Sequence, residues 1–231
     1  MRGLIMRTPG QRQQNFAIEA LLNEAAAAAG MDPIAFRLAH TSDQRAIELV
    51  HATAKAAEWQ TRPSPNPKAR SEDGKQLHGR GMCLMLRQNG YWVGIAEIIV
   101  TPSTGAIQVI RFTIGAEPGK IINPRQLERC MLSGVVMGLS EALKEEVTFD
   151  TGKITSTNWS SYKILTMVEM PEIKTVQISR EDKGYAGGSE PANAVCPAAV
   201  AAAFHDATGI HPRRIPLTPA YVSGLLKTAG T

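Results

Sequence analysis

A chain of 231 residues is long enough for one large domain or two small ones. Its 43% hydrophobic and 20% charged residues are ordinary for a folded globular protein and exclude a disordered chain. The formal charge of +4 comes from dispersed Lys and Arg residues. Because nucleic-acid binding needs a clustered basic face with stacking aromatics, we expect no nucleic-acid partner.

The cysteines and histidines are scattered along the chain. Cys83, Cys130 and Cys196 form no CxxC pair. The sequence therefore predicts no disulfide framework and no protein-ligated metal. No apolar run reaches the ~18 residues of a membrane span, and the first residues lack the apolar core of a signal peptide. We expect neither membrane insertion nor an export signal in this chain.

Residues 1–60 are predicted to form a helical segment. Spacings of three and four predict a helix over 14–29. Its expected inner face consists of Phe16, Ile18, Leu21, Leu22 and Ala25. Asp32-Pro33 begins a second helix, because Asp caps helix N-termini and Pro suits the first helical position. A third helix is predicted over 43–59.

A proline-rich stretch, residues 61–78, is predicted to be a solvated linker or an extended crossing segment. Residues 79–115 then predict three strands that are joined by short turns, in an antiparallel meander. The first turn is expected at Asn89-Gly90, a dipeptide typical of tight hairpins. The meander opens a larger α+β portion that covers 79–231.

Helices and strands alternate in the last hundred residues. A helix is predicted over 124–147, and Gly134 and Gly138 on one side of it indicate close packing against another element. A short hairpin should follow around Thr151-Gly152. Period-two alternation predicts a strand over 172–180, and an alanine-rich helix is expected from about 191 to 207.

A glycine-rich loop, Gly184 to Glu190, precedes that last helix. Glycines let backbone approach a large ligand, and a helix N-terminus favours the ionised carboxylate that a general base needs. The alternative is purely structural: Ser189 is an ordinary N-cap, Pro191 an ordinary first residue, and acidic residues are favoured in first turns. The local sequence leaves both interpretations open.

Motifs spread over nearly the whole chain support the first interpretation. They are Met6–Gly10, Asn15–Glu19, Asp32-Pro33, Gly79–Gly81, Ile122–Pro124, Gly138–Ser140, Ser161–Leu165, Gly187–Glu190 and Phe204–Gly209. Their order resembles the molybdopterin-binding subunits of the xanthine dehydrogenase and aldehyde oxidase family, in the branch of isoquinoline 1-oxidoreductase and nicotinate dehydrogenase.

The resemblance implies an α+β molybdenum-cofactor-binding domain and a reaction. That reaction is hydroxylation of a carbon next to a heteroatom, in an N-heterocycle or an aldehyde, with water as the oxygen source. Glu190 matches the glutamate that acts as general base in the family. Arg7 and Gly10 match a segment near the metal, although Arg7 could equally be exposed in a loop before a helix. The remaining residues implied to contact the cofactor are Gly187, Gly188 and Ser189.

The resemblance also implies partners. The cofactor would be molybdenum–molybdopterin, with the cytosine dinucleotide form as one option, and it would be shared with another chain. Family subunits are several times longer, so we expect the rest of the molybdenum subunit and a 2Fe-2S subunit to complete a heteromer. The expected location is cytoplasmic, or periplasmic if a partner exports the complex.

Some positions depart from the family pattern. Ser189 stands where the family usually has glycine, and Cys130–Ser133 occupies the place of a Gln-x-x-Gly motif. These departures favour a second hypothesis, in which the chain is a non-catalytic, degenerate fragment or an assembly partner of such an enzyme.

Overall fold

The computed structural model describes residues 6–229 and has an α+β architecture, as predicted. Its helices are α1 (Gln11–Ala28), α2 (Pro33–Ala39), α3 (Gln44–Ala56), α4 (Pro124–Leu143), η1 (Met167–Glu169), α5 (Pro191–Thr208) and α6 (Pro219–Ala229). Its strands are β1 (Leu77–Arg87), β2 (Gly90–Thr101), β3 (Ala106–Glu117), β4 (Phe149–Asp150), β5 (Lys153–Ile154) and β6 (Glu172–Gln177). None of the described helices is long and apolar enough to cross a membrane.

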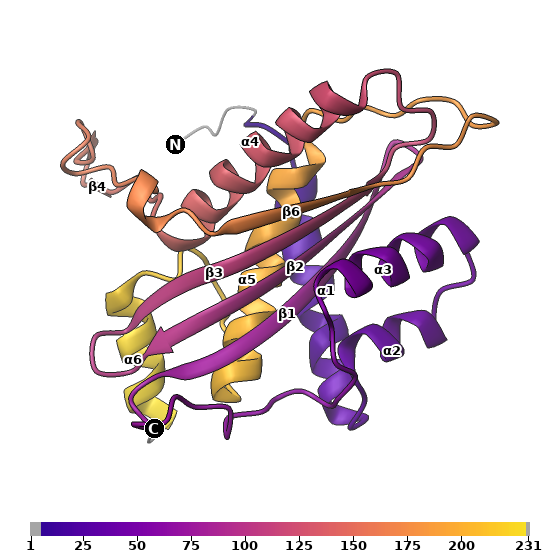
Figure 1. Ribbon diagram of the computed structural model, residues 1–231. Helices are drawn as coiled ribbons and strands as arrows, with labels where there is room; N and C mark the ends of the chain where they lie inside the picture. Colours follow the sequence, from indigo (N-terminus) through magenta and orange to yellow (C-terminus); the bar gives the residue numbers. More distant parts are fainter. Residues whose placement is uncertain (1–5, 230–231) are drawn as a thin grey trace.

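One four-stranded sheet, in the order β1-β2-β3-β6, organises the molecule (Figure 1). The first three strands form the predicted antiparallel meander, and β6 joins parallel to β3. The turn between β1 and β2 differs from the prediction by one residue. Arg87 pairs with Gly90, and the turn residues Gln88 and Asn89 both have positive φ, of 50° and 66°. Asparagine tolerates this left-handed backbone, so Asn89 occupies the second turn position and Gly90 begins the strand.

Helices cover both faces of the sheet (Figure 1). α5 packs on one face, where a Cβ atom on Gly81 would collide with the backbone of Ala203. α3 packs on the other face, where a Cβ atom on Gly115 would collide with Thr53. Glycine at these two strand positions therefore lets each helix lie close against the sheet.

α5 is buried along all of its 18 residues. The sheet covers one side of it, and α1 and α4 cover others. Gly134 and Gly138 of α4 lie directly against Ala192 and Asn193 of α5, which confirms the close packing predicted from these two glycines. Because α5 is surrounded, its small residues and lack of an amphipathic pattern are what the position requires.

The buried face of α1 contradicts the prediction. Ile18 and Leu21 are 56% and 67% exposed, whereas Glu19 and Asn23 are buried. The reason is a polar core: the Glu19 carboxylate pairs with Arg37 of α2 at 2.9 Å, and the Arg37 guanidinium also donates to the Asn23 side chain. The periodicity rule places charged residues in solvent. Here Glu19 and Arg37 can be buried because they pair with each other and form further hydrogen bonds.

Two other features also differ from the sequence predictions. α4 ends at Leu143 rather than near residue 147, because the chain turns there toward the β4–β5 hairpin, which lies around Gly152 as expected. The last helix, α6, buries Val222 and Leu226 and was not predicted. The proline-rich segment is irregular up to Gln76, and it packs on α5 where Arg62 binds both carboxylate oxygens of Asp206, at 2.8 and 2.7 Å.

Candidate functional site

Ser189 does not cap the N-terminus of α5, contrary to the purely structural interpretation of the glycine-rich loop. Glu190, and not Ser189, is the N-cap residue, with φ −106° and ψ −45°, and its side chain makes no capping hydrogen bond. Pro191 is the first helical residue, as expected. The Glu190 side chain is therefore not used to close the helix end and is available for other contacts.

Arg7 holds the backbone just before Glu190. Its Nε donates to the carbonyl oxygen of Ser189 at 2.6 Å, and its Nη2 donates to the same oxygen. Its Nη1 faces α4, at 3.5 Å from Ser133 Oγ and 3.0 Å from Met137 Sδ. The structure thus brings Arg7, Ser189 and Glu190 together from positions more than 180 residues apart.

Thr8 holds the backbone on the other side. It is buried, and its hydroxyl lies 2.9 Å from the carbonyl oxygen of Glu190 and 2.7 Å from Oδ1 of Asn193. Two consecutive N-terminal residues therefore bind the carbonyl groups of Ser189 and Glu190. Gly10 is exposed and is the N-cap residue of α1, with φ 70°. Glycine adopts that left-handed backbone without strain.

The Glu190 carboxylate forms an ion pair with Arg87 at the end of β1, through Oε2 and Nη2. The Glu190 side chain is 34% exposed and that of Arg87 14%. Nη1 of Arg87 donates to Oε1 of Gln11, the first residue of α1, at 2.6 Å. A half-buried cation that is itself held in place therefore orients the carboxylate.

The two glycines before Ser189 have close protein neighbours. A Cβ atom on Gly188 would lie 2.7 Å from Cδ1 of Leu127 in α4, and one on Gly187 would lie 3.0 Å from Oε1 of Gln88. Both neighbours are the ends of flexible side chains, so these glycines lie close to protein atoms that can move aside. Gly187 remains exposed, on the same loop as Ser189.

Sequence reasoning missed Thr8, Gln11, Arg87 and Asn193 at this site. A register prediction could have placed Arg87 at the end of the first strand, but not opposite the start of α5. Thr8 lies inside the Met6–Gly10 motif, which gives no sign that this residue is buried. Among residues 6–229, no group of three or more His, Cys, Asp or Glu residues is arranged to hold a metal ion.

Comparison with known proteins identifies the family. A model described as "molybdopterin cofactor-binding domain" matches residues 17–171. One of the subunits of nicotinate dehydrogenase from Pseudomonas putida is 35% identical over 238 residues, which cover 100% of this chain and 20% of that protein. The beta subunit of isoquinoline 1-oxidoreductase from Brevundimonas diminuta is 30% identical over 216 residues, which cover 93% of this chain and 26% of that protein.

The fold is similar to that of a solved enzyme as well. The aldehyde oxidoreductase of Desulfovibrio gigas superposes with a TM-score of 0.74 at 15% identity, over 97% of this chain and 42% of that one. The chain spans only about a fifth to a quarter of the length of the two curated relatives. Since the family model matches more than half of its residues, the chain belongs to the molybdopterin cofactor-binding domain family.

Proposed function

We propose that this chain forms part of a molybdenum hydroxylase and that Glu190 is the general base of the reaction. The observation that supports the proposal is the fixed position of one carboxylate. Glu190 stands at the N-terminus of a fully buried helix, its flanking carbonyl groups bound by Arg7 and Thr8, with its side chain one-third exposed. A general base needs such a fixed and accessible carboxylate.

The residues around Glu190 fit a molybdenum cofactor by their chemistry. Arg7 and Arg87 are cationic, and the exposed backbone at Gly187 and Ser189 offers polar groups to a large anionic ligand. Bound there, the cofactor supplies the redox chemistry, while the protein supplies binding, orientation and a base. As one option, we propose that the bound cofactor is the cytosine dinucleotide form of molybdopterin.

In this scheme Glu190 takes a proton from the oxygen nucleophile, which derives from water, as that oxygen attacks a carbon next to a heteroatom. Arg87 binds Oε2 of Glu190, so Oε1 is the atom that we assign to proton transfer. Arg87 orients the carboxylate before the reaction, and Arg7 keeps the N-cap backbone in place. An N-heterocycle is the substrate class that we favour, because nicotinate and isoquinoline appear in the names of two relatives.

The proposed enzyme is a heteromer. Because the chain spans a fifth to a quarter of the two curated relatives, we propose that further polypeptide completes the molybdenum subunit. A 2Fe-2S subunit would then receive the electrons. The completing polypeptide would share the cofactor with the edge of this chain that contains Glu190.

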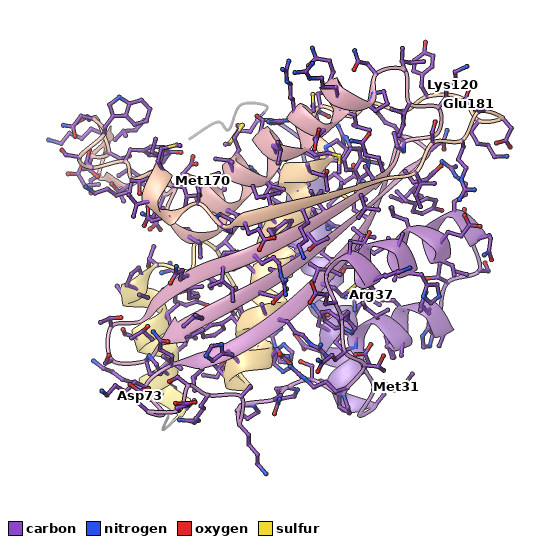
Figure 2. All side chains as sticks on the ribbon, in the orientation of Figure 1. Met31, Arg37, Asp73, Lys120, Met170 and Glu181 are labelled. Carbon is purple, nitrogen blue, oxygen red and sulfur yellow. The ribbon has the colours of Figure 1, made fainter. Side chains whose placement is uncertain are left out.

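The test compares Glu190→Gln with Glu181→Gln in the assembled complex. Both replace a carboxylate by an amide, but Glu181 lies in the exposed segment between β6 and the glycine-rich loop, paired with Lys120 at 3.1 Å (Figure 2). We expect Glu190→Gln to lower kcat by about 10²- to 10⁴-fold. Molybdenum content should stay unchanged, and Glu181→Gln should be near wild type. Full turnover of Glu190→Gln would refute the assignment of the base.

The second hypothesis is that the chain is a non-catalytic fragment or an assembly partner. The observation in its favour is that Arg87 already pairs with Glu190, at a site where Ser189 replaces the usual glycine. This hypothesis predicts that the assembled complex turns over equally well with Glu190→Gln. It also predicts that the purified chain never copurifies with molybdenum.

A further inference from the structure

The segment between α4 and β6, residues 144–171, extends from the body of the protein as an arm (Figure 1). It contains the β4–β5 hairpin and η1, and it rejoins the sheet next to Met170 (Figure 2). Seven of the fifteen exposed large hydrophobic residues of the described chain lie on this arm. The most exposed are Trp159, Met167 and Val168, at 75%, 87% and 95%. So dense an apolar surface is typical of a protein interface.

The arm has an ordered backbone although its apolar side chains face solvent. The Asn158 side chain accepts hydrogen bonds from the backbone N–H groups of Ser160 and Ser161, at 3.0 and 3.1 Å. At its base, Tyr162 donates to Glu145 at 2.6 Å. These contacts fix the apolar surface before any partner arrives, which lowers the entropic cost of binding.

A groove continues this surface onto the sheet. It is a cavity of about 680 Å³ between the arm, β3 and the segment before α6, and its lining includes Leu165, Val168, Ile107 and Leu217. It follows the outer edge of the first half of β3. Among the described strands, β6 pairs with β3 only from Arg111 onward, so residues 106–110 leave a strand edge open.

The register of β3 explains why its partner strand stops there. Val109 pairs with Ile98 of β2 and Arg111 with Glu97, so Ile110 is an extra residue in a β-bulge. A bulge bends a strand and increases its twist, which separates the two halves of β3. An extended segment of a partner can pair with the open half of β3 and so add a strand to the sheet.

We infer that the arm and this groove form the docking surface for the polypeptide that completes the molybdenum-binding subunit. The inference rests on the proposed function. It is favoured over a second copy of the chain, because the two curated relatives devote about three quarters or more of their length to other segments that this part must contact. The lining of the groove is mainly apolar: Lys144 and Glu169 pair with each other at its base, and Lys163 adds one cation. The surface therefore suits a mainly apolar partner segment.

The test uses the complex of this chain with the completing polypeptide. Trp159→Ser combined with Val168→Ser should weaken their association at least about tenfold. The control Ile122→Ser removes an equally exposed apolar side chain, 72% exposed, from the segment before α4 and should leave association unchanged. Because all three side chains are exposed, thermal unfolding of the free chain should stay the same.

Photo-crosslinking identifies the occupant. With p-benzoylphenylalanine in place of Trp159, the crosslinked peptides should come from the completing polypeptide. Crosslinks to a second copy, or equal affinity of the double variant and wild type, would overturn the inference. If the wild-type chain does not associate with that polypeptide at all, the proposed function fails together with the inference. Association that survives the double substitution refutes only the docking surface.

Discussion

Acidification should destabilise the fold through one histidine pair. His205 of α5 is buried and stacks on His211, with ring centroids 3.6 Å apart. Burial, with the His211 charge next, lowers the pKa of His205 to about 4, although Asp206 and Glu24 oppose the shift. Burial also lowers the pKa of His211. The fold therefore favours two neutral rings, since protonation would put a charge between stacked rings away from water.

The size of the effect follows from the shift for His205. In the unfolded chain this histidine has a pKa of about 6.5. The neutral buried ring therefore does not lower the unfolding free energy above that pH, but the unfolding free energy decreases as the pH falls from about 6.5 toward 4. A shift from 6.5 to about 4 corresponds to roughly 3 kcal/mol at the acid limit, and to about 2 kcal/mol between pH 7 and pH 4.5.

Urea unfolding at pH 7 and pH 4.5 measures this loss. In His205→Gln the decrease in unfolding free energy between the two pH values should be about 2 kcal/mol smaller than in wild type. Carboxylates that also titrate in this range are common to both proteins. His51→Gln, on the exposed side of α3, is the control and should behave as wild type. An equal pH dependence in wild type and His205→Gln would refute the reasoning.

Two further substitutions test the packing and the polar core. Gly81→Ala should lower the unfolding free energy by about 1–3 kcal/mol or more, because its Cβ would collide with α5, whereas Gly184→Ala meets nothing within 4 Å and should be neutral in thermal unfolding. Arg37→Met leaves the carboxylate of Glu19 buried without its cation and should cost about 3–5 kcal/mol. The exposed Arg213→Met should cost at most about 1 kcal/mol in the same denaturant titration, and similar costs for the two arginines would contradict the polar-core argument.

Several features were predicted correctly from one local rule each. The meander, the Asp32 cap and the close packing of Gly134 and Gly138 follow from turn chemistry, capping and residue size. The buried face of α1 was predicted wrongly, because the ion pair of Glu19 with Arg37 overrides hydrophobic periodicity. No single-sequence rule predicts that a charged side chain will find its buried partner on a different helix.

The candidate site shows the same limit at longer range. The glycine loop and the helix after it could be predicted, and so could a carboxylate at their junction. The cation opposite that carboxylate could not, because Arg87 reaches Glu190 only after β1 and α5 pack together. Thr8 likewise contacts Glu190 and Asn193 only when the N-terminal segment lies across the start of α5.

The burial of α5 explains how the chain can hold the proposed base, Glu190, in place before any cofactor binds. Every residue of the helix is buried, and Gly138 lets α4 pack closely against the backbone of Asn193 near the start of α5. A shift of the N-cap would therefore disrupt the core and the contacts of Arg7 and Thr8 together. Since a catalytic group acts best when its position costs no reorganisation during the reaction, the buried helix is the structural reason for proposing Glu190 as the base.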